Sequence, residues 1–123
     1  MDTNGNTKEL IKDLCSRLPY GVKVLVDNKH WIDFDGRTPS KLTFDNSYRL
    51  LYVGTDLGYV KPYLFPLSSM TEEQKSQYSF FLTRIIDGYD SSLLIDWLNK
   101  NHFDYRGLIE KGLAIDATEL NVY

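Results

Sequence analysis

The spacing of hydrophobic residues changes from a helical period to a strand period and back again along the chain. Leu10, Leu14 and Leu18 recur at i, i+4 and i+8, which is the spacing of one apolar face of an α-helix. Pro19 disfavours helical backbone at the residue before it. The sequence therefore predicts a first helix over residues 7–18.

A period of two begins at residue 22. In the run VKVLV, the side chains of Val22, Val24 and Val26 would share one face of a β-strand. The runs HWIDFD, KLTFD, YRLLYV and GYV also suit extended backbone, and Asp-Asn and Asp-Gly pairs mark turns between them. Because short turns join neighbouring strands in an antiparallel arrangement, residues 21–60 are predicted to form a small curled antiparallel sheet or barrel of about five strands.

The next stretch, KPYLFPLSSM, leads from the predicted sheet into a helical region. Pro62 and Pro66 would fix the backbone where the chain turns, so residues 61–70 are interpreted as a structural joint. Thr71 and Gln74 then have the spacing of a capping box, which predicts the start of a helix.

Residues 71–117 return to helical spacing and predict three helices. The first carries an apolar stripe along one face, the second starts near Asp90, and the third is capped by Asp104 and ends at Gly112. The whole chain, residues 1–123, is therefore predicted to be a single α+β domain with an N-terminal helix, a sheet and three C-terminal helices.

Charge and composition limit the partners of the chain. Its 123 residues carry a net charge of -3, and neither half has the clustered basic stripe that strong nucleic-acid binding requires. No apolar run approaches the roughly 18 residues that span a bilayer, so no membrane partner is predicted. The one cysteine, Cys15, cannot form an internal disulfide and fits a reducing cytoplasm, which is the predicted location.

Two carboxylates, Asp33 and Asp35, lie two residues apart on a predicted strand and would point to the same face. Such a pair can act in acid–base catalysis or hold a divalent cation, or it can simply face solvent beside a turn. The two histidines, His30 and His102, and Cys15 lack the spacing of a zinc site. The sequence therefore predicts no catalytic residue, metal site or cofactor, and a small enzyme that uses Asp33 and Asp35 stays an alternative.

The segment HFDYRG concentrates the residue types that dominate protein interfaces. His102, Phe103, Tyr105 and Arg106 lie within five positions, and aromatic and arginine side chains are enriched at interface hot spots. Phe65 would join these candidates if the joint exposes its ring. The same side chains also suit packing between two short helices, so both interpretations stay open.

Four basic residues of the N-terminal half carry a second alternative. Lys23, Lys41, Arg49 and Lys61 are the candidate phosphate contacts of a nucleic-acid-associated accessory protein. Binding of this kind would weaken steeply as the salt concentration rises.

Three stretches resemble a known family. LPYGVKV, KPYLFPLSSMTEEQ and DWLNKNHFDYRGLIEKGLAIDA, in this order, are similar to motifs of a large family of small uncharacterised proteins from gut Bacteroides-type bacteria, their phages and other mobile elements. The resemblance covers the end of the first helix, the joint and nearly all of residues 96–117, but not the sheet between residues 27 and 58. It implies a bacterial cytoplasm and a mobile-element setting, and it carries over no activity, cofactor or catalytic residue. A basic residue is common in the family at the position of Phe65, and its absence here puts in doubt a phosphate- or carboxylate-binding role at that position.

These observations together predict a non-enzymatic interaction protein. Its partner is predicted to be a protein, and its setting an accessory role in a bacterial mobile element, with modulation of host machinery as one form of that role. The identity of the partner and the oligomeric state stay open.

Overall fold

The computed structural model describes residues 5–27, 38–55, 58, 60–88 and 90–123. Its helices are α1 (Gly5–Arg17), α2 (Phe44–Tyr48), α3 (Glu72–Ile86) and α4 (Ser92–Lys100). Its strands are β1 (Lys23–Val26), β2 (Ser40–Lys41), β3 (Val60–Pro66), β4 (Phe103–Asp104) and β5 (Ile115–Asp116). Two short 3-10 turns (Leu18–Tyr20 and Leu67–Ser69) follow α1 and β3, and a π-helical segment (Arg49–Gly54) follows α2.

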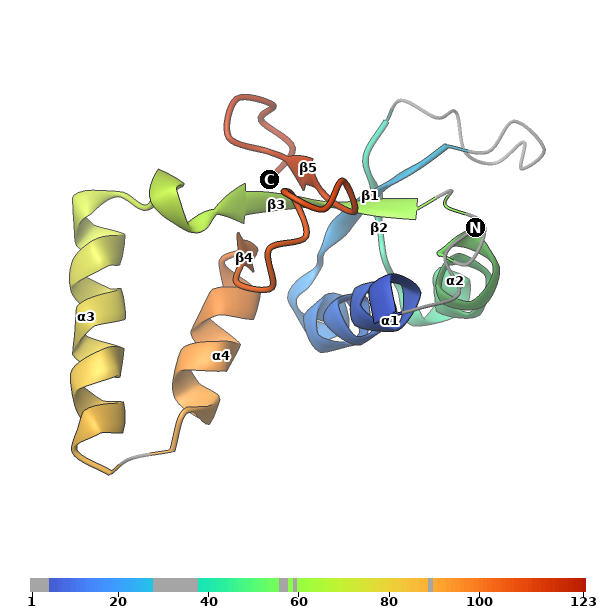
Figure 1. Cartoon of the computed structure of the whole chain (residues 1–123). Helices are drawn as coiled ribbons and strands as arrows, with labels where there is room; N and C mark the ends of the chain where they lie inside the picture. The colour runs from blue at the N-terminus through green and yellow to red at the C-terminus, as the bar shows by residue number, and fades with distance from the viewer. Residues whose placement is uncertain (1–4, 28–37, 56–57, 59, 89) are drawn as a thin grey trace.

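Strand β3 is the centre of an open mixed sheet (Figure 1). The strand order is β2-β1-β3-β4, and β5 also pairs with β3. Strand β1 is antiparallel to β2 and β3, whereas β4 and β5 run parallel to β3. The α+β class and the N-terminal helix are confirmed. The prediction of a purely antiparallel, possibly closed sheet is wrong, because the described strands include parallel pairs and do not close into a barrel.

Most of β3 consists of residues 61–66, although the two prolines in this stretch predict a structural joint. Prolines disfavour a central strand because they cannot donate a backbone hydrogen bond. Pro62, Leu64 and Pro66 direct their backbone groups to the same edge, since these directions alternate along a strand. On this edge the Leu64 carbonyl accepts a hydrogen bond from the Ala117 N–H at 2.8 Å, and β5 pairs with β3 over only two residues. The prolines flank this short pairing, which is why the strand tolerates them.

The run YRLLYV is helical and not extended as predicted. Thr43 and Asn46 form a reciprocal capping box, in which each side chain accepts a hydrogen bond from the backbone N–H of the other residue (3.3 and 2.9 Å). This cap starts α2, and the π-helical segment continues the helical path to residue 54. Leu50 and Leu51 are both buried there, whereas a strand would turn one of two consecutive side chains outward.

Two of the three predicted C-terminal helices are present as α3 and α4, and the third is not. The Asp104 carboxylate accepts hydrogen bonds from the Leu108 and Ile109 N–H groups, both at 2.9 Å, but these belong to a turn and not to a helix. The backbone that follows forms only turns. Gly107 and Gly112 adopt positive φ angles of 73° and 74°, which end helical backbone on either side of this segment.

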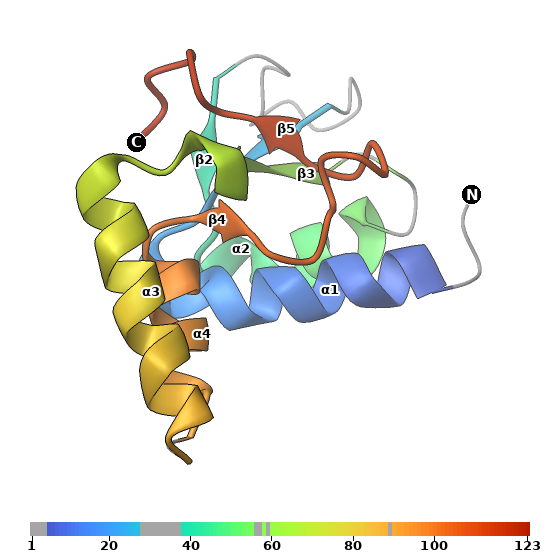
Figure 2. The same ribbon diagram turned by 60° about the vertical axis from the view of Figure 1, so that its left-hand side comes forward.

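Two clusters of buried side chains hold the elements together. The larger cluster joins α1, which runs beneath the sheet in Figure 2, to β1, β3 and the π-helical segment; it includes Leu10, Leu14, Val22, Val24, Val26, Leu42, Leu50, Leu51, Val60, Leu64, Leu108 and Ala114. The smaller cluster joins α3 and α4 to β4 and consists of Met70, Leu94, Leu98 and Phe103, with Phe65, Tyr78, Phe81, Ile85, Trp97 and Tyr105 packed around them.

Helices α3 and α4 form a hairpin that extends away from the sheet and from α1 (Figure 1). We call this hairpin the helical arm. Helix α3 starts at the predicted capping box of Thr71 and Gln74 and is 15 residues long, yet none of its residues is buried. Tyr78, Phe81 and Ile85 pack partly against the smaller cluster. Helix α3 therefore leaves Phe80, Leu82 and Ile86 exposed.

Candidate protein-binding site

The pairing of β3 with β4 brings Phe65, His102 and Phe103 together. Phe65 lies opposite Phe103, and its N–H donates a hydrogen bond to the His102 carbonyl at 2.8 Å. Phe103 is only 2% exposed, so it belongs to the core and is no surface contact. Phe65 and His102 are half-buried and line a cavity of about 390 Å³ together with Tyr123. Three of the five predicted contact residues therefore meet at one place.

Tyr105 and Arg106 belong instead to a charge cluster around Asp13. Asp13 and Arg17 lie one turn apart on α1, and the side chains of both are 0% exposed. Arg17 Nε donates to one carboxylate oxygen of Asp13 at 2.8 Å, and Arg106 Nε donates to the other at 3.2 Å. The guanidinium groups of Arg17 and Arg106 lie 5.2 and 5.1 Å from the ring centre of Tyr105, whose hydroxyl donates to Asn99 at 2.9 Å. This cluster ties α1 to the segment after β4 and is structural.

Tyr123 fills the space beside His102 and Phe65. Its ring stacks on the imidazole, with centroids 3.7 Å apart and planes inclined by 11°, and its centroid lies 5.9 Å from that of Phe65. Its hydroxyl reaches into the sheet, where it accepts a hydrogen bond from the Lys23 N–H and donates one to the Tyr63 carbonyl, both at 2.8 Å. The hydroxyl thus bridges β1 and β3, and its burial raises the pKa of Tyr123 to about 12.

His102 has an unusual backbone and an unusual environment. Its φ angle is 62°, in the left-handed region where asparagine, aspartate and histidine are the commonest residues after glycine. Its Nδ1 atom is buried and has no hydrogen-bond partner among the described residues. Burial, with a smaller contribution from the positive charges of Arg17 and Lys23, lowers the pKa of His102 to about 4. The imidazole is therefore neutral at neutral pH.

We expect the protein to lose stability as the pH falls from about 6.5 to about 4. Above pH 6.5 His102 is neutral in both the folded and the unfolded chain, so its packing contributes fully to the free energy of unfolding. Within this pH window the unfolded chain, with a histidine pKa near 6.5, takes up a proton before the folded chain does. After allowance for the partial exposure of the ring, the loss in unfolding free energy is roughly 1–2 kcal/mol.

Urea unfolding at pH 7.5 and pH 4.5 measures this loss, and His102→Asn is the matched variant because asparagine tolerates the left-handed backbone. The difference between the two pH values should be smaller in the variant. Equal pH dependence of the two chains would show that His102 does not carry the effect.

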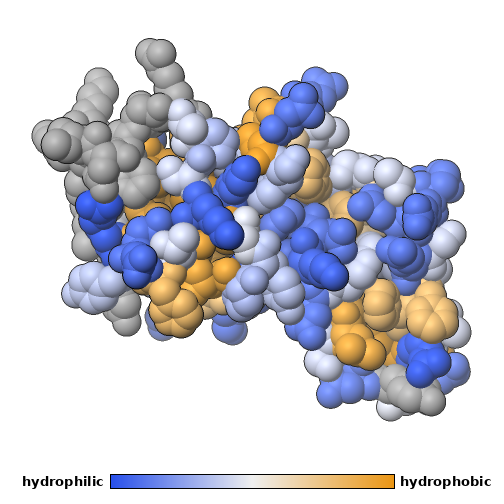
Figure 3. Space-filling model, turned by 180° about the vertical axis from the view of Figure 1, so that it is seen from behind, coloured by the Kyte–Doolittle hydropathy of each residue, from blue (hydrophilic) through white to orange (hydrophobic). Residues whose placement is uncertain are grey.

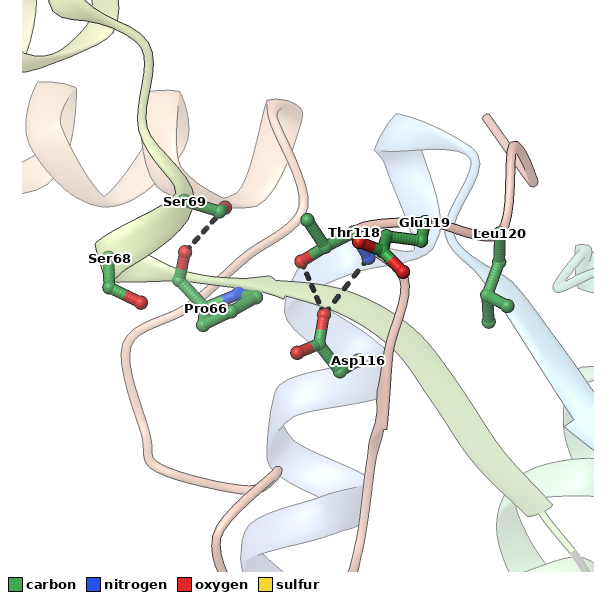
Figure 4. Close-up of a pocket in the computed structure, with 7 residues that line it drawn as sticks. All are labelled: Pro66, Ser68, Ser69, Asp116, Thr118, Glu119 and Leu120. Atoms are coloured by element: carbon green, nitrogen blue, oxygen red, sulfur yellow. Dashed lines mark hydrogen bonds between the residues drawn. The ribbon is translucent and has the colours of Figure 1, made fainter.

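A second hollow, of about 530 Å³, adjoins the first and shares Ser69 and Thr118 with it (Figure 4). The Asp116 carboxylate accepts hydrogen bonds from both the backbone N–H and the hydroxyl of Thr118, which lowers the pKa of Asp116. The Ser69 hydroxyl donates to the Pro66 carbonyl at 2.7 Å. The hydrogen bonds of this hollow thus join residues two or three positions apart, so local turns give it its shape.

Three of the four basic candidates share one face of the sheet. Lys23 lies opposite Lys41, and Lys61 lies opposite Leu25, and directly opposed residues project to the same face. The Lys23 ammonium, however, donates a hydrogen bond to the main-chain carbonyl of Val122 at 2.7 Å. Arg49 begins the π-helical segment and is not on the sheet. Lys41 and Lys61 are thus the two exposed lysines that this face offers from the predicted set.

The predicted strand HWIDFD, with Asp33 and Asp35, lies outside the described residues. Within residues 5–27, 38–55, 58, 60–88 and 90–123, no group of three or more His, Cys, Asp and Glu side chains is placed to hold a metal ion. In the same part of the chain, none of the helices has the length and apolar character needed to cross a bilayer.

The helical arm carries an apolar groove whose residues are not among the candidates predicted from the sequence. Two hollows of about 130 and 380 Å³ lie along α3 and α4 and share Phe80 and Phe81, with Leu93 lining the first and Trp97 the second. We call the surface of these four residues the arm groove. Phe80 is 58% and Leu93 is 65% exposed. Figure 3 shows apolar surface at the outer end of the arm, at the lower right. A signal was present in the sequence, because adjacent aromatic residues on one helix cannot both face the same neighbour.

Comparison with family models, with curated proteins and with solved structures finds no significant match to this chain. The geometry of the site is therefore the main guide to function.

Proposed function

We propose that this chain is a non-enzymatic interaction protein that binds a protein partner through the arm groove. The observation that supports this proposal is a 15-residue helix without a buried residue, on an arm whose large apolar side chains face solvent. The exposed apolar residues of the arm are Phe80, Leu82, Ile86, Leu93 and Ile95.

The energetics favour a covered groove. Soluble proteins rarely leave contiguous apolar surface open unless it is an interaction site. Full burial of one large apolar side chain contributes roughly 1.5–3 kcal/mol, so covering Phe80 and Leu93 together supplies several kcal/mol to binding. Trp97 is a rigid anchor at the same surface, because its indole N–H donates to Gln77 at 3.1 Å. Aromatic anchors of this kind dominate interface hot spots.

The shape and charge of the groove favour an amphipathic helix as the docking element of the partner. A groove along two helices accepts the apolar face of a third helix, with contacts repeating every three or four residues. Arg84 and Asp90 line the outer end of the groove beside Leu93 and supply charges of both signs there. Polar residues at one end of the partner helix would therefore fit this rim.

We further propose that the partner is a host protein and that this chain is an accessory protein of a bacterial mobile element. The resemblance of the motifs LPYGVKV, KPYLFPLSSMTEEQ and DWLNKNHFDYRGLIEKGLAIDA to that family supports this setting. They also support a bacterial cytoplasm as the place of action.

The test compares two double variants that each remove two exposed apolar side chains. Phe80→Ser with Leu93→Ser alters the arm groove, and Phe44→Ser with Tyr48→Ser alters α2, where these residues are 86% and 73% exposed. Capture from a lysate of a gut Bacteroides-type bacterium should recover the same partner with the wild type and the α2 variant. The arm variant should recover it at least about tenfold less, because two hot-spot contacts are lost.

Both double variants should keep the unfolding midpoint of the wild type, since exposed substitutions change stability little. Equal recovery by the wild type and the arm variant would refute the arm groove as the binding surface.

A further inference from the structure

We propose a second binding site, a slot that recognises the phenol side chain of tyrosine. Tyr123 occupies this slot within the chain, and a tyrosine from a partner segment can take its place. The site uses other residues than the arm groove and does not depend on the function proposed for the arm.

The base of the slot is a fixed pair of backbone groups. The Lys23 N–H and the Tyr63 carbonyl belong to neighbouring strands, and a hydroxyl between them accepts from the first and donates to the second. A phenol satisfies both groups at once, whereas a phenyl ring would leave the Lys23 N–H and the part-buried Tyr63 carbonyl without this partner. Sites built in this way discriminate strongly against the analogue that lacks the hydroxyl.

The walls of the slot suit a flat aromatic ring. The neutral imidazole of His102 stacks on the ring with centroids 3.7 Å apart, and the ring of Phe65 lies tilted beside it with its centroid 5.9 Å away. His102 holds this position with a left-handed backbone, at φ 62°. This is the left-handed backbone that commonly ends a helix, and here it directly follows Asn101, the C-cap of α4.

The segment that carries Tyr123 has few attachments to the rest of the fold. Residues 118–123 have no helix or strand, and all but one are exposed. Beyond the Ala117–Leu64 hydrogen bond at its start, its hydrogen bonds with elements before β5 in the described part of the chain are those of the Tyr123 hydroxyl and the one from the Lys23 ammonium to the Val122 carbonyl. Segments with so few buried contacts open locally at low cost. Thr118 lines both polar hollows, so an opened segment would join them into one path that leads to the slot.

The experiment titrates the full chain with N-acetyltyrosinamide and, as the matched control, N-acetylphenylalaninamide. Two-dimensional NMR follows the wild type and the Tyr123→Ala variant. In the variant, the tyrosine compound should bind with a dissociation constant in roughly the millimolar range, and the phenylalanine compound about tenfold more weakly. In the wild type, the tyrosine compound should bind more weakly than in the variant, since it must displace Tyr123, and should shift the signals of His102 and of residues 118–123.

Equal binding of the two compounds, or no binding to a folded Tyr123→Ala chain, would overturn the slot. If the tyrosine compound shifts no signals of the wild type, the proposal that a ligand tyrosine can displace Tyr123 is overturned. If Tyr123→Ala does not fold, Tyr123→Leu keeps apolar volume beside Phe65 while it frees the hydroxyl position, and the same comparison applies. The Phe80→Ser, Leu93→Ser chain should bind the tyrosine compound like the wild type, so failure of the arm groove and failure of the slot are distinguishable.

Discussion

Replacing Asp13 by alanine is expected to lower the free energy of unfolding by about 3–5 kcal/mol. The substitution leaves the fully buried guanidinium of Arg17 without its carboxylate, so its remaining hydrogen bond goes to the Phe103 carbonyl. Arg17 Nη1 already has no hydrogen-bond partner among the described residues. Arg106 loses its contact with the same carboxylate. Urea unfolding at pH 7.5, followed by circular dichroism, measures the change.

Glu9→Ala is the matched control, because it removes the ion pair of Glu9 with Lys111 at the surface of the same helix. Exposed pairs contribute little, so this variant should unfold close to the wild type. Asp13→Leu combined with Arg17→Met removes both buried charges and should recover much of the lost stability. A loss in Asp13→Ala no larger than in Glu9→Ala would show that the cluster is not buried as described.

Replacing Phe103 by alanine is expected to cost about 3–5 kcal/mol of unfolding free energy. The ring is 2% exposed and stacks on Trp97, with centroids 5.6 Å apart. It also meets Phe65 edge to face, so it joins the helical arm to β3. Its loss leaves a cavity at the base of the arm that the neighbouring elements cannot fill completely.

The control for Phe103→Ala is Phe80→Ala, which removes the same side chain from the exposed face of the arm. We expect Phe80→Ala to lower the free energy of unfolding by no more than about 0.5–1 kcal/mol, because a substitution at the surface leaves no cavity. Thermal unfolding of the two variants side by side makes the comparison. Similar losses at the two positions would contradict the assignment of Phe103 to the core and of Phe80 to the surface.

Features that depend on neighbouring residues could be predicted from the sequence. The leucine spacing of α1, the capping box of Thr71 and Gln74 and the alternation of β1 all act within a few residues, and each appears in the structure. The helical path of residues 44–54 also had a local signal. Thr43 and Asn46 have capping spacing, but a Thr–Asn pair is a weaker signature than Thr–Glu, and the pair Asp45-Asn46 also suits a turn.

Features that depend on distant pairing could not be predicted in this way. Pro62 and Pro66 disfavour a central strand unless the partner on their shared edge is short, and the sequence does not reveal how long β5 is. The sequence pattern predicts Asp104 as the N-cap of a third C-terminal helix, but the positive φ angles of Gly107 and Gly112 leave only turns after it. The same limit applies to the site. Phe65 and His102 were selected by residue type, whereas their contact with Tyr123 joins segments far apart in the sequence.

Site-specific photo-cross-linking tests the central claim, that the arm groove is the surface that contacts a partner. A benzoylphenylalanine in place of Phe80 probes the groove, and the same substitution in place of Phe44 probes α2. Both positions hold an exposed phenylalanine, so the probe changes each site little. In a lysate of a gut Bacteroides-type bacterium, illumination should give a discrete cross-linked protein from position 80 and none from position 44. Absence of a discrete product at position 80, or the same products from both positions, would contradict the account.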